Sequence, residues 1–164
     1  MNMNRWNPFV LALCFIAIAT LLLGSGAQAG SPAGKLAVIV AKDSPVKNLT
    51  RDELKRIFLS DAVIVAGRKL VPFNFAPGTS PRKGFDKSLL GMSEDAMQRF
   101  WIDRKVRGQP GAPRGLPSSV VVIGVTAKFP GAIAYVPARD LTPEVQAVTI
   151  DGVPHTSPAY TITE

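Results

Sequence analysis

The sequence Val71-Pro-Phe-Asn-Phe-Ala-Pro-Gly-Thr-Ser-Pro-Arg-Lys-Gly-Phe85 predicts a strand, a tight turn and a helix in immediate succession. Apolar side chains alternate from Val71 to Phe75, which indicates a short strand that leaves a core. Ala76-Pro77-Gly78 then breaks the strand. Ser80 is typical of a helix N-cap, and Pro81 suits the first helical position. The rest of the chain is interpreted around this joint.

The beginning of that helix is the candidate binding site. The first backbone N–H groups of a helix have no internal acceptor, and the helix dipole is positive there. Arg82 and Lys83 add two cations to the same turn. This combination suits phosphate, sulfate or a carboxylate, so the predicted ligand contacts are Gly78, Thr79, Ser80 and Arg82. In the structural alternative, the hydroxyls only cap the helix, Gly78 only supplies a turn, and Arg82 is solvated.

Residues 1–29 are predicted to be a signal peptide. Arg5 supplies a positive charge, an apolar run extends from Pro8 to Leu23, and Ala27-Gln28-Ala29 is a small-x-small cleavage site. The run is shorter than the ~20 apolar residues that a spanning helix needs, so no stable membrane insertion is expected after cleavage. We expect cleavage after Ala29, a periplasmic location, and one domain over residues 30–164.

Composition excludes several classes of function. The chain has 19 Lys and Arg against 12 Asp and Glu, and losing Arg5 lowers its net charge from +7 to +6. A basic protein suggests a nucleic-acid ligand, but an exported domain does not meet the nucleic acid of its own cell. The one cysteine, Cys14, lies in the predicted signal peptide, so the domain has no disulfide. With His155 as the only histidine, no metal site, cofactor or enzymatic triad is predicted.

The stretches before the central joint predict a strand, a helix and a second short strand. Leu36–Ala41 is a continuous run of apolar residues, which predicts a buried parallel strand. The segment Leu49-Thr-Arg-Asp-Glu-Leu54 contains a capping box and a hydrophobic staple, so a short helix follows and ends near Ser60. Val63–Val65 predicts a brief strand, and Gly67–Lys69 predicts a turn.

Gly91 is predicted to end the central helix, and Ser93 to cap another one. Met97, Phe100 and Trp101 lie on adjacent turns of that second helix, so they are expected to bury a large aromatic face. A proline/glycine loop follows at residues 107–117. Four cations flank it and are interpreted either as solubilising charge or as a docking site for an acidic partner: Arg104, Lys105, Arg107 and Arg114.

The last third of the chain decides the fold class. Ser118–Lys128 fits a strand by its β-branched residues and a helix by its cap and spacing. Ala132–Val136 and Val145–Ile150 are predicted strands. Strands that alternate with helices predict an α/β fold with a mixed, largely parallel sheet flanked by helices.

These segments, in this order, resemble the phosphate-type periplasmic solute-binding proteins of ABC transporters. The most specific are Leu49-Thr-Arg-Asp-Glu-Leu-Lys-Arg-Ile-Phe58 and Pro130-Gly-Ala-Ile-Ala-Tyr-Val136, and Val148-Thr-Ile-Asp-Gly-Val-Pro154 supports them. The resemblance implies a type-II periplasmic-binding-protein-like fold, with Ser118–Lys128 as a helix. The chain is similar to a short, half-length subgroup, and it has Pro77–Arg82 where the family has a Ser-Gly-Thr-type turn.

The resemblance also implies a function. It favours an exported, non-enzymatic protein that binds a small phosphate-like anion and has an ABC permease as partner. The alternative is an interaction or sensor module without a small ligand, which docks another protein of the cell envelope. Depending on the alignment, Phe73 or Phe75 stands where phosphate binders of this family have an arginine.

Overall fold

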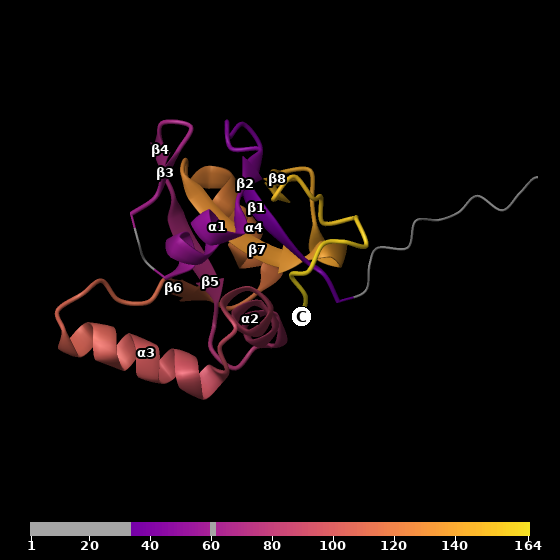
Figure 1. Cartoon of the computed structure of the whole chain (residues 1–164). Helices are drawn as coiled ribbons and strands as arrows, with labels where there is room; N and C mark the ends of the chain where they lie inside the picture. The colour runs from indigo at the N-terminus through magenta and orange to yellow at the C-terminus, as the bar shows by residue number, and fades with distance from the viewer. Residues whose placement is uncertain (1–33, 60–61) are drawn as a thin grey trace, which may run out of the picture. The chain divides into compact units, whose positions relative to one another are not determined.

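A central sheet organises the computed structural model, which describes residues 34–59 and 62–164 (Figure 1). The predicted signal peptide, residues 1–29, lies outside the described residues. The strands of the sheet are β1 (Leu36–Ala41), β5 (Val71–Phe75), β6 (Arg114–Leu116), β7 (Ala132–Pro137) and β8 (Val145–Ala147). Their order is β6-β5-β7-β1-β8. The predicted strand at the start of the central joint is therefore confirmed as β5.

Four of these five strands point the same way. β5 pairs in parallel with β6 and β7, whereas β1 is antiparallel to β7 and β8, so β8 has the direction of β7. The mixed, largely parallel sheet is confirmed, but the expectation that Leu36–Ala41 is a parallel strand is wrong. Residues Leu36 to Val40 are at most 1% exposed. A continuous apolar run indicates that both faces of a strand are buried. Burial does not determine whether the strand pairs in a parallel or an antiparallel direction.

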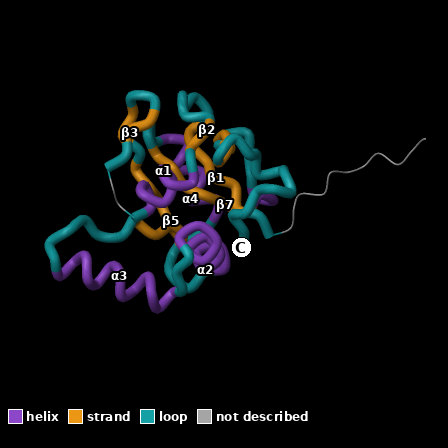
Figure 2. Tube along the Cα trace, in the orientation of Figure 1, coloured by secondary structure: helices purple, strands orange, loops and turns teal. Residues whose placement is uncertain are grey.

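Helices surround the strands (Figure 2). α4 contacts β1, β5, β7 and β8, whereas α1 and α2 contact β5. A π-helical segment, η1, continues α2 without a break. The helical segments are α1 (Arg51–Phe58), α2 (Ser80–Phe85), η1 (Asp86–Leu90), α3 (Glu94–Val106), α4 (Ser119–Lys128) and the 3₁₀ turn η2 (Ala138–Asp140).

Local capping places most helix ends as the sequence predicts. The Thr50 hydroxyl accepts from the Glu53 amide at 3.2 Å, and the Glu53 carboxylate accepts from the Thr50 amide at 2.8 Å. Gly91, with φ of 70°, ends η1, and Ser93 caps α3. Ser118 caps α4, so the helical interpretation of Ser118–Lys128 is confirmed. α2 begins at Ser80 with Thr79 as its N-cap, one residue earlier than predicted.

Short pairings that the sequence did not predict complete the strands. β3 (Ile64–Val65) and β4 (Arg68–Lys69) form an antiparallel hairpin, so Arg68 and Lys69 lie in a strand where a turn was expected. β2 (Asn48–Leu49) pairs in parallel with β9 (Thr149–Ile150). The predicted last strand over residues 145–150 is thus divided between two sheets. Similarly, the predicted loop over 107–117 contains β6, because hydrogen bonding to β5 can hold a glycine-containing segment that has little strand propensity of its own.

Aromatic rings fill the core beneath α1 and α2. The Tyr135 ring in β7 stacks on Phe85 with centroids 3.7 Å apart, and Phe58 of α1 lies edge-on to Phe85 at 4.6 Å. The Tyr135 hydroxyl donates to Asn74 Oδ1 at 2.8 Å. This buried hydrogen bond joins β7 to β5 and fixes the strand that leads into α2.

α3 lies away from the sheet and is largely exposed (Figure 1). Met97 is its buried residue, and Phe100 and Trp101 are half-buried against each other and under the Arg104 guanidinium. The expectation of a large buried aromatic face on this helix is therefore wrong. Helical spacing shows which residues share a face, but it does not show whether the rest of the protein covers that face.

No helix within the described ranges is both long enough and apolar enough to cross a membrane.

Candidate functional site

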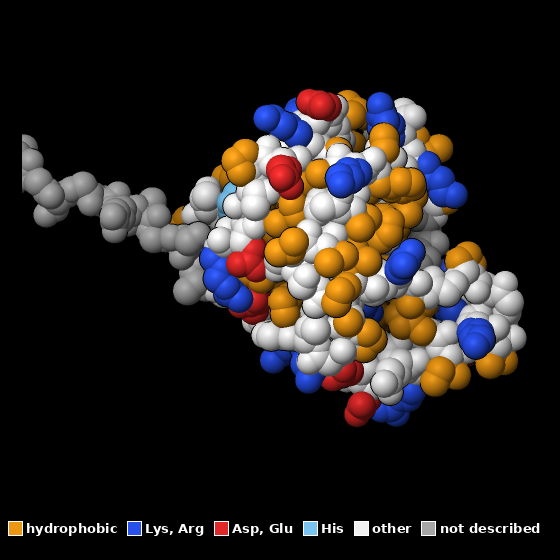
Figure 3. Space-filling view, turned by 180° about the vertical axis from the view of Figure 1, so that it is seen from behind, with side chains coloured by type: hydrophobic (Ala, Val, Ile, Leu, Met, Phe, Trp, Pro, Cys, Tyr) orange, Lys and Arg blue, Asp and Glu red, His pale blue; other side chains and the backbone are white. Residues whose placement is uncertain are grey.

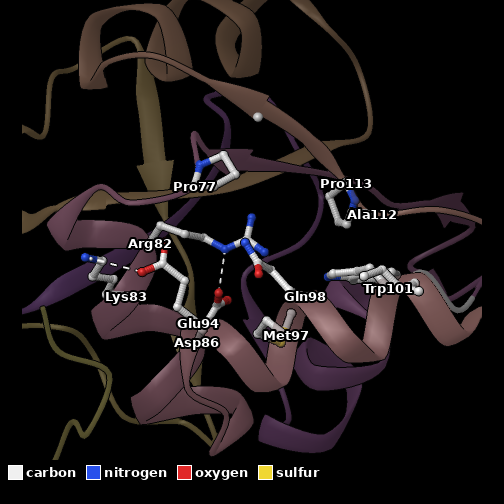
Figure 4. Close-up of a pocket in the computed structure, with 12 residues that line it drawn as sticks. Pro77, Arg82, Lys83, Asp86, Glu94, Met97, Gln98, Trp101, Ala112 and Pro113 are labelled. Atoms are coloured by element: carbon white, nitrogen blue, oxygen red, sulfur yellow. Dashed lines mark hydrogen bonds and ion pairs between the residues drawn. The ribbon is translucent and has the colours of Figure 1, made fainter.

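A cavity of about 520 Å³ lies beside the central joint (Figure 4). α2 and η1 form one side of it, α3 forms another, and the loop before β6 lies opposite. Its lining residues are Pro77, Arg82, Lys83, Asp86, Glu94, Met97, Gln98, Trp101, Ile102, Ala112, Pro113 and Gly115. The cavity thus brings together residues from both sides of Gly91, where the chain reverses between the two helices.

A buried ion pair forms the polar part of this cavity. Arg82 Nε donates to Asp86 Oδ2 at 2.6 Å, and the two side chains are only 10% and 6% exposed. The i,i+4 spacing on a continuous helical segment brings them together. Nε donates to Asp86, and the terminal nitrogens of the guanidinium make no hydrogen bond to any residue that the structure describes. Their N–H groups can therefore donate to a ligand in the cavity.

The other oxygen of Asp86 has no partner. Oδ1 is buried and makes no hydrogen bond to any described residue. Burial raises the pKa of this carboxyl, the Glu94 carboxylate adds to the increase, and the Arg82 guanidinium opposes it. Oδ1 can therefore accept a hydrogen bond from a ligand that brings a donor.

The edge of the cavity carries a weaker ion pair. Lys83 Nζ lies 3.3 Å from Glu94 Oε2 and links α2 to the first turn of α3. Both side chains are exposed, so this pair contributes little to stability. It leaves Lys83 as a cation on a flexible stem that can turn toward an anion.

α3 supplies an apolar wall. Met97, Trp101 and Ile102 line the cavity from this helix, with Pro77 and Pro113 across from them. The Trp101 ring is half-buried, and its Nε1 is buried without a hydrogen-bond partner among the described residues. The indole N–H is thus unpaired but lies beneath the surface of the wall, which also carries the polar side chains of Glu94 and Gln98.

The structure separates the four predicted contact residues. Arg82 lines the cavity, whereas Gly78 and Ser80 line a shallower one of about 320 Å³ together with Lys83, which lines both. Gly78 has the positive φ expected of its turn, 84°. The Thr79 hydroxyl donates to the Ala76 carbonyl at 2.8 Å, so its proton is already used.

Asp86 and Trp101 were not identified as site residues from the sequence. Asp86 stands four residues after Arg82, a spacing that predicts an ion pair on a helix. The spacing alone does not show that this pair is buried in a cavity, so it did not mark Asp86 as a site residue. Trp101 was assigned to the core, because its spacing gave no sign that α3 lies apart from the sheet.

A metal site is not formed in the described part of the chain, where no three His, Cys, Asp or Glu side chains come together. His155 is half-buried in the C-terminal segment, and burial together with the Lys35 charge lowers its pKa.

Exposed apolar side chains occur elsewhere on the surface. Ile102 and Val106 of α3 are 62% and 82% exposed, and Val120 of α4 is 80% exposed. Figure 3 shows the face behind that of Figure 1, where hydrophobic side chains lie next to one another with Lys and Arg among them. Large exposed apolar areas mark interaction sites in many proteins.

Comparison with known proteins gives matches in structure but not in sequence. No protein-family model and no curated protein sequence matches the chain. One similar structure is described as a putative phosphate ABC transporter substrate-binding protein with bound phosphate from Clostridium perfringens, at 20% identity and a TM-score of 0.58. Two others are an ABC-type phosphate transport receptor from Vibrio cholerae, at 16% and 0.57, and PstS from Borrelia burgdorferi, at 16% and 0.53.

The likeness covers most of this chain and half of the others. It spans 73%, 72% and 73% of this chain, but 46%, 46% and 48% of the three solved chains. The chain therefore spans about half the length of the structures that it matches. At these identities the likeness establishes the fold, and the chain has the α/β fold of phosphate-transport binding proteins, as the resemblance implied.

Proposed function

We propose that the protein is an exported binding protein that takes a small oxyanion where α2 begins, with Arg82 as its main contact. The observation that carries this proposal is the buried guanidinium of Arg82, which Asp86 holds at 2.6 Å through Nε alone. A buried, fixed arginine with free terminal N–H groups matches the geometry of carboxylate, phosphate and sulfate.

Lys83 adds a second cation beside Arg82. It lines the same cavity, and its exposed ion pair with Glu94 is weak. Gly78 and Ser80 line the shallower cavity, and both the amide and the hydroxyl of Thr79 donate to the Ala76 carbonyl, so the proposed anion contacts Arg82 and not these three residues.

The transport role is proposed from the solved structures. One of them is described with bound phosphate, and two are described as phosphate-transport components. By analogy we propose a periplasmic location, no enzymatic activity, and an ABC permease as partner. The likeness covers about half the length of those chains, so the analogy concerns the aligned part only.

Isothermal titration calorimetry of the protein with phosphate, sulfate and carboxylates tests the proposal. We expect binding of at least one anion, and its loss in the double variant Arg82→Gln/Asp86→Asn, which removes both charges and leaves no unpaired buried ion. Lys83→Ala should weaken binding about 3- to 10-fold, whereas Lys128→Ala on α4 should not change it. Absence of heat with every anion would overturn the proposal.

A second candidate function is an interaction module of the cell envelope. The exposed Ile102 and Val106 on α3 favour it, since the helix also carries Arg104 and Lys105 and Arg107 follows at its end. Pull-down from envelope extracts with wild type and Val106→Glu, a position outside the cavity lining, separates the two functions. A partner that only the wild type retains supports the module, whereas anion binding that both proteins keep supports the binding protein.

A further inference from the structure

The cavity beside Arg82 is much larger than an inorganic oxyanion. Its volume of about 520 Å³ lies within the range of ~300–1,000 Å³ that pockets for organic ligands occupy. A water molecule takes ~30 Å³ in the liquid, and phosphate has only five heavy atoms. Phosphate at Arg82 would leave most of the cavity to water.

Polar side chains gather around Arg82 inside this cavity. Asp86 of η1 and Glu94 and Gln98 of α3 lie near it, whereas Trp101 and Ile102 line the cavity farther along α3 (Figure 4). Water along an apolar wall is displaced favourably by an apolar group. The arrangement therefore matches a molecule with one charged end and an apolar body.

Two unpartnered atoms further specify such a molecule. Asp86 Oδ1 is an acceptor on a side chain that is only 6% exposed, and Trp101 Nε1 is a buried donor. Buried polar groups are nearly always paired. A ligand that donates to Oδ1, beside an anionic group on Arg82, would satisfy the acceptor once the side chains that cover Oδ1 shift.

We propose that this cavity binds a small organic carboxylate with an aromatic or aliphatic body and a hydrogen-bond donor next to the carboxylate, as in a 2-hydroxy acid. The carboxylate contacts the Arg82 guanidinium, and the donor contacts Asp86 Oδ1. The apolar body lies against Met97 and Trp101. The inference rests on the proposed function, since it assigns a chemical class of ligand to the same anion site.

Titration calorimetry of the full chain with matched probes tests each part of this class. The reference probe is 3-phenyllactate. Lactate lacks the ring, 3-phenylpropanoate lacks the hydroxyl, 3-phenylpropane-1,2-diol lacks the carboxylate, and inorganic phosphate has a charge and a hydroxyl donor but no apolar body. We expect 3-phenyllactate to bind about tenfold or more tightly than each of the other four, because each omits one interaction.

The outcomes separate this inference from the proposed function. Binding of phosphate or lactate as tight as that of 3-phenyllactate would overturn the inference and leave the proposed function intact. Equal binding of the diol would overturn both, because the charge would then play no part. No binding of any probe would also overturn both.

Two variants at exposed glutamines locate the bound probe. Gln98 lines the cavity, so Gln98→Phe should fill it and reduce 3-phenyllactate affinity at least about tenfold. Gln109 is also exposed, but it lies in the loop after α3 and does not line the cavity, so Gln109→Phe is the matched control and should bind normally. Equal affinity in both variants would place the ligand elsewhere and overturn the inference.

Tryptophan fluorescence gives a second measurement. The chain has two tryptophans, Trp6 and Trp101, so Trp6→Phe leaves the cavity residue as the only one. We expect 3-phenyllactate to change the emission of Trp101 in this variant with the dissociation constant found by calorimetry. An unchanged emission at saturation would contradict contact with the α3 wall.

Discussion

Gly84 of α2 lies where the surrounding backbone leaves no room for a larger side chain. A Cβ at this position would overlap the backbone of Glu164 and lie 2.5 Å from the Thr163 carbonyl oxygen. Gly84→Ala must therefore displace the C-terminal segment or shift α2, and we expect a loss of about 1–3 kcal/mol in the free energy of unfolding. Urea unfolding followed by circular dichroism measures it.

Gly124 is the matched control for that substitution. It lies inside α4, and the place that a Cβ would occupy has no neighbouring atom within 4 Å. Gly124→Ala should therefore stabilise the protein by about 0.5–1 kcal/mol, because alanine loses less backbone entropy in a helix. A lower free energy of unfolding for Gly84→Ala and a higher one for Gly124→Ala would support the packing of the C-terminal segment on α2. A neutral Gly84→Ala would contradict that packing.

The hydrogen bond between Tyr135 and Asn74 gives another prediction. Tyr135→Phe keeps the ring that stacks on Phe85 but leaves Asn74 Oδ1, which is buried, without its donor. We expect a cost of about 1–3 kcal/mol in unfolding free energy. The double variant Tyr135→Phe/Asn74→Leu should recover part of that loss, since no polar atom is then left unpaired. A double variant less stable than the single one would be evidence against this account.

Local interactions explain which side chains the sequence places correctly. The partners in the capping box of Thr50 and Glu53 are three residues apart, so the sequence contains the whole interaction. Arg82 and Asp86 are four residues apart, and their pairing is equally visible. Their burial is not visible, because it depends on α3 and on the loop before β6. The candidate site could therefore be predicted only at Arg82.

α3 is expected to be the least protected helix of the described chain. It has one buried residue, Met97, and lies away from the sheet, whereas every residue of β7 is buried. Few buried contacts allow a segment to open locally at low free energy. Hydrogen exchange followed by mass spectrometry should show faster exchange in residues 94–106 than in residues 132–137.

A substitution at Met97 sharpens that prediction. Met97→Ala should speed hydrogen exchange throughout α3 and leave exchange in β7 unchanged. The buried Met97 side chain packs α3 against the rest of the domain, and it takes no part in holding β7 in the sheet. Gln109→Phe, after the helix, serves as the control. If exchange rose equally in α3 and β7, the helix would open together with the central sheet, and the prediction of local opening would be wrong.

Element type was predictable where the pattern is strong, and element partners were not. Leu36–Ala41 is a strand by its apolar run, yet its antiparallel pairing with β7 and β8 depends on residues about a hundred positions away. α4 shows the opposite case. Its β-branched residues favour a strand by propensity, and only the resemblance to known proteins decided for a helix.

For the chain as a whole, the order of segments was more informative than any one segment. No sequence comparison finds a relative, but the structural likeness to phosphate-transport proteins confirms the fold that this order implied. Function does not follow in the same way, because the likeness covers only about half of those proteins and establishes the fold alone. Ligand chemistry must therefore come from this chain's own cavity.

Export is the prediction that concerns the whole molecule. In a bacterium with a periplasm, we expect the chain to lose residues 1–29 and the mature protein to begin at Gly30. Signal peptidases require small residues at the last and third-last positions of the signal, here Ala29 and Ala27. Cell fractionation with intact mass measurement should find the shortened chain in the periplasm.

Three substitutions decide whether that site is used. Ala27→Glu and Ala29→Glu should each leave the chain at full mass, since a large charged side chain does not fit the peptidase. Gln28→Glu introduces the same side chain at the position between them and should be processed normally. If all three variants were cleaved, or the unchanged chain stayed at full mass in the cytoplasm, export through this signal would be wrong. A periplasmic role would then be wrong. Ligand binding in the cavity at Arg82 is a separate property and could still be tested.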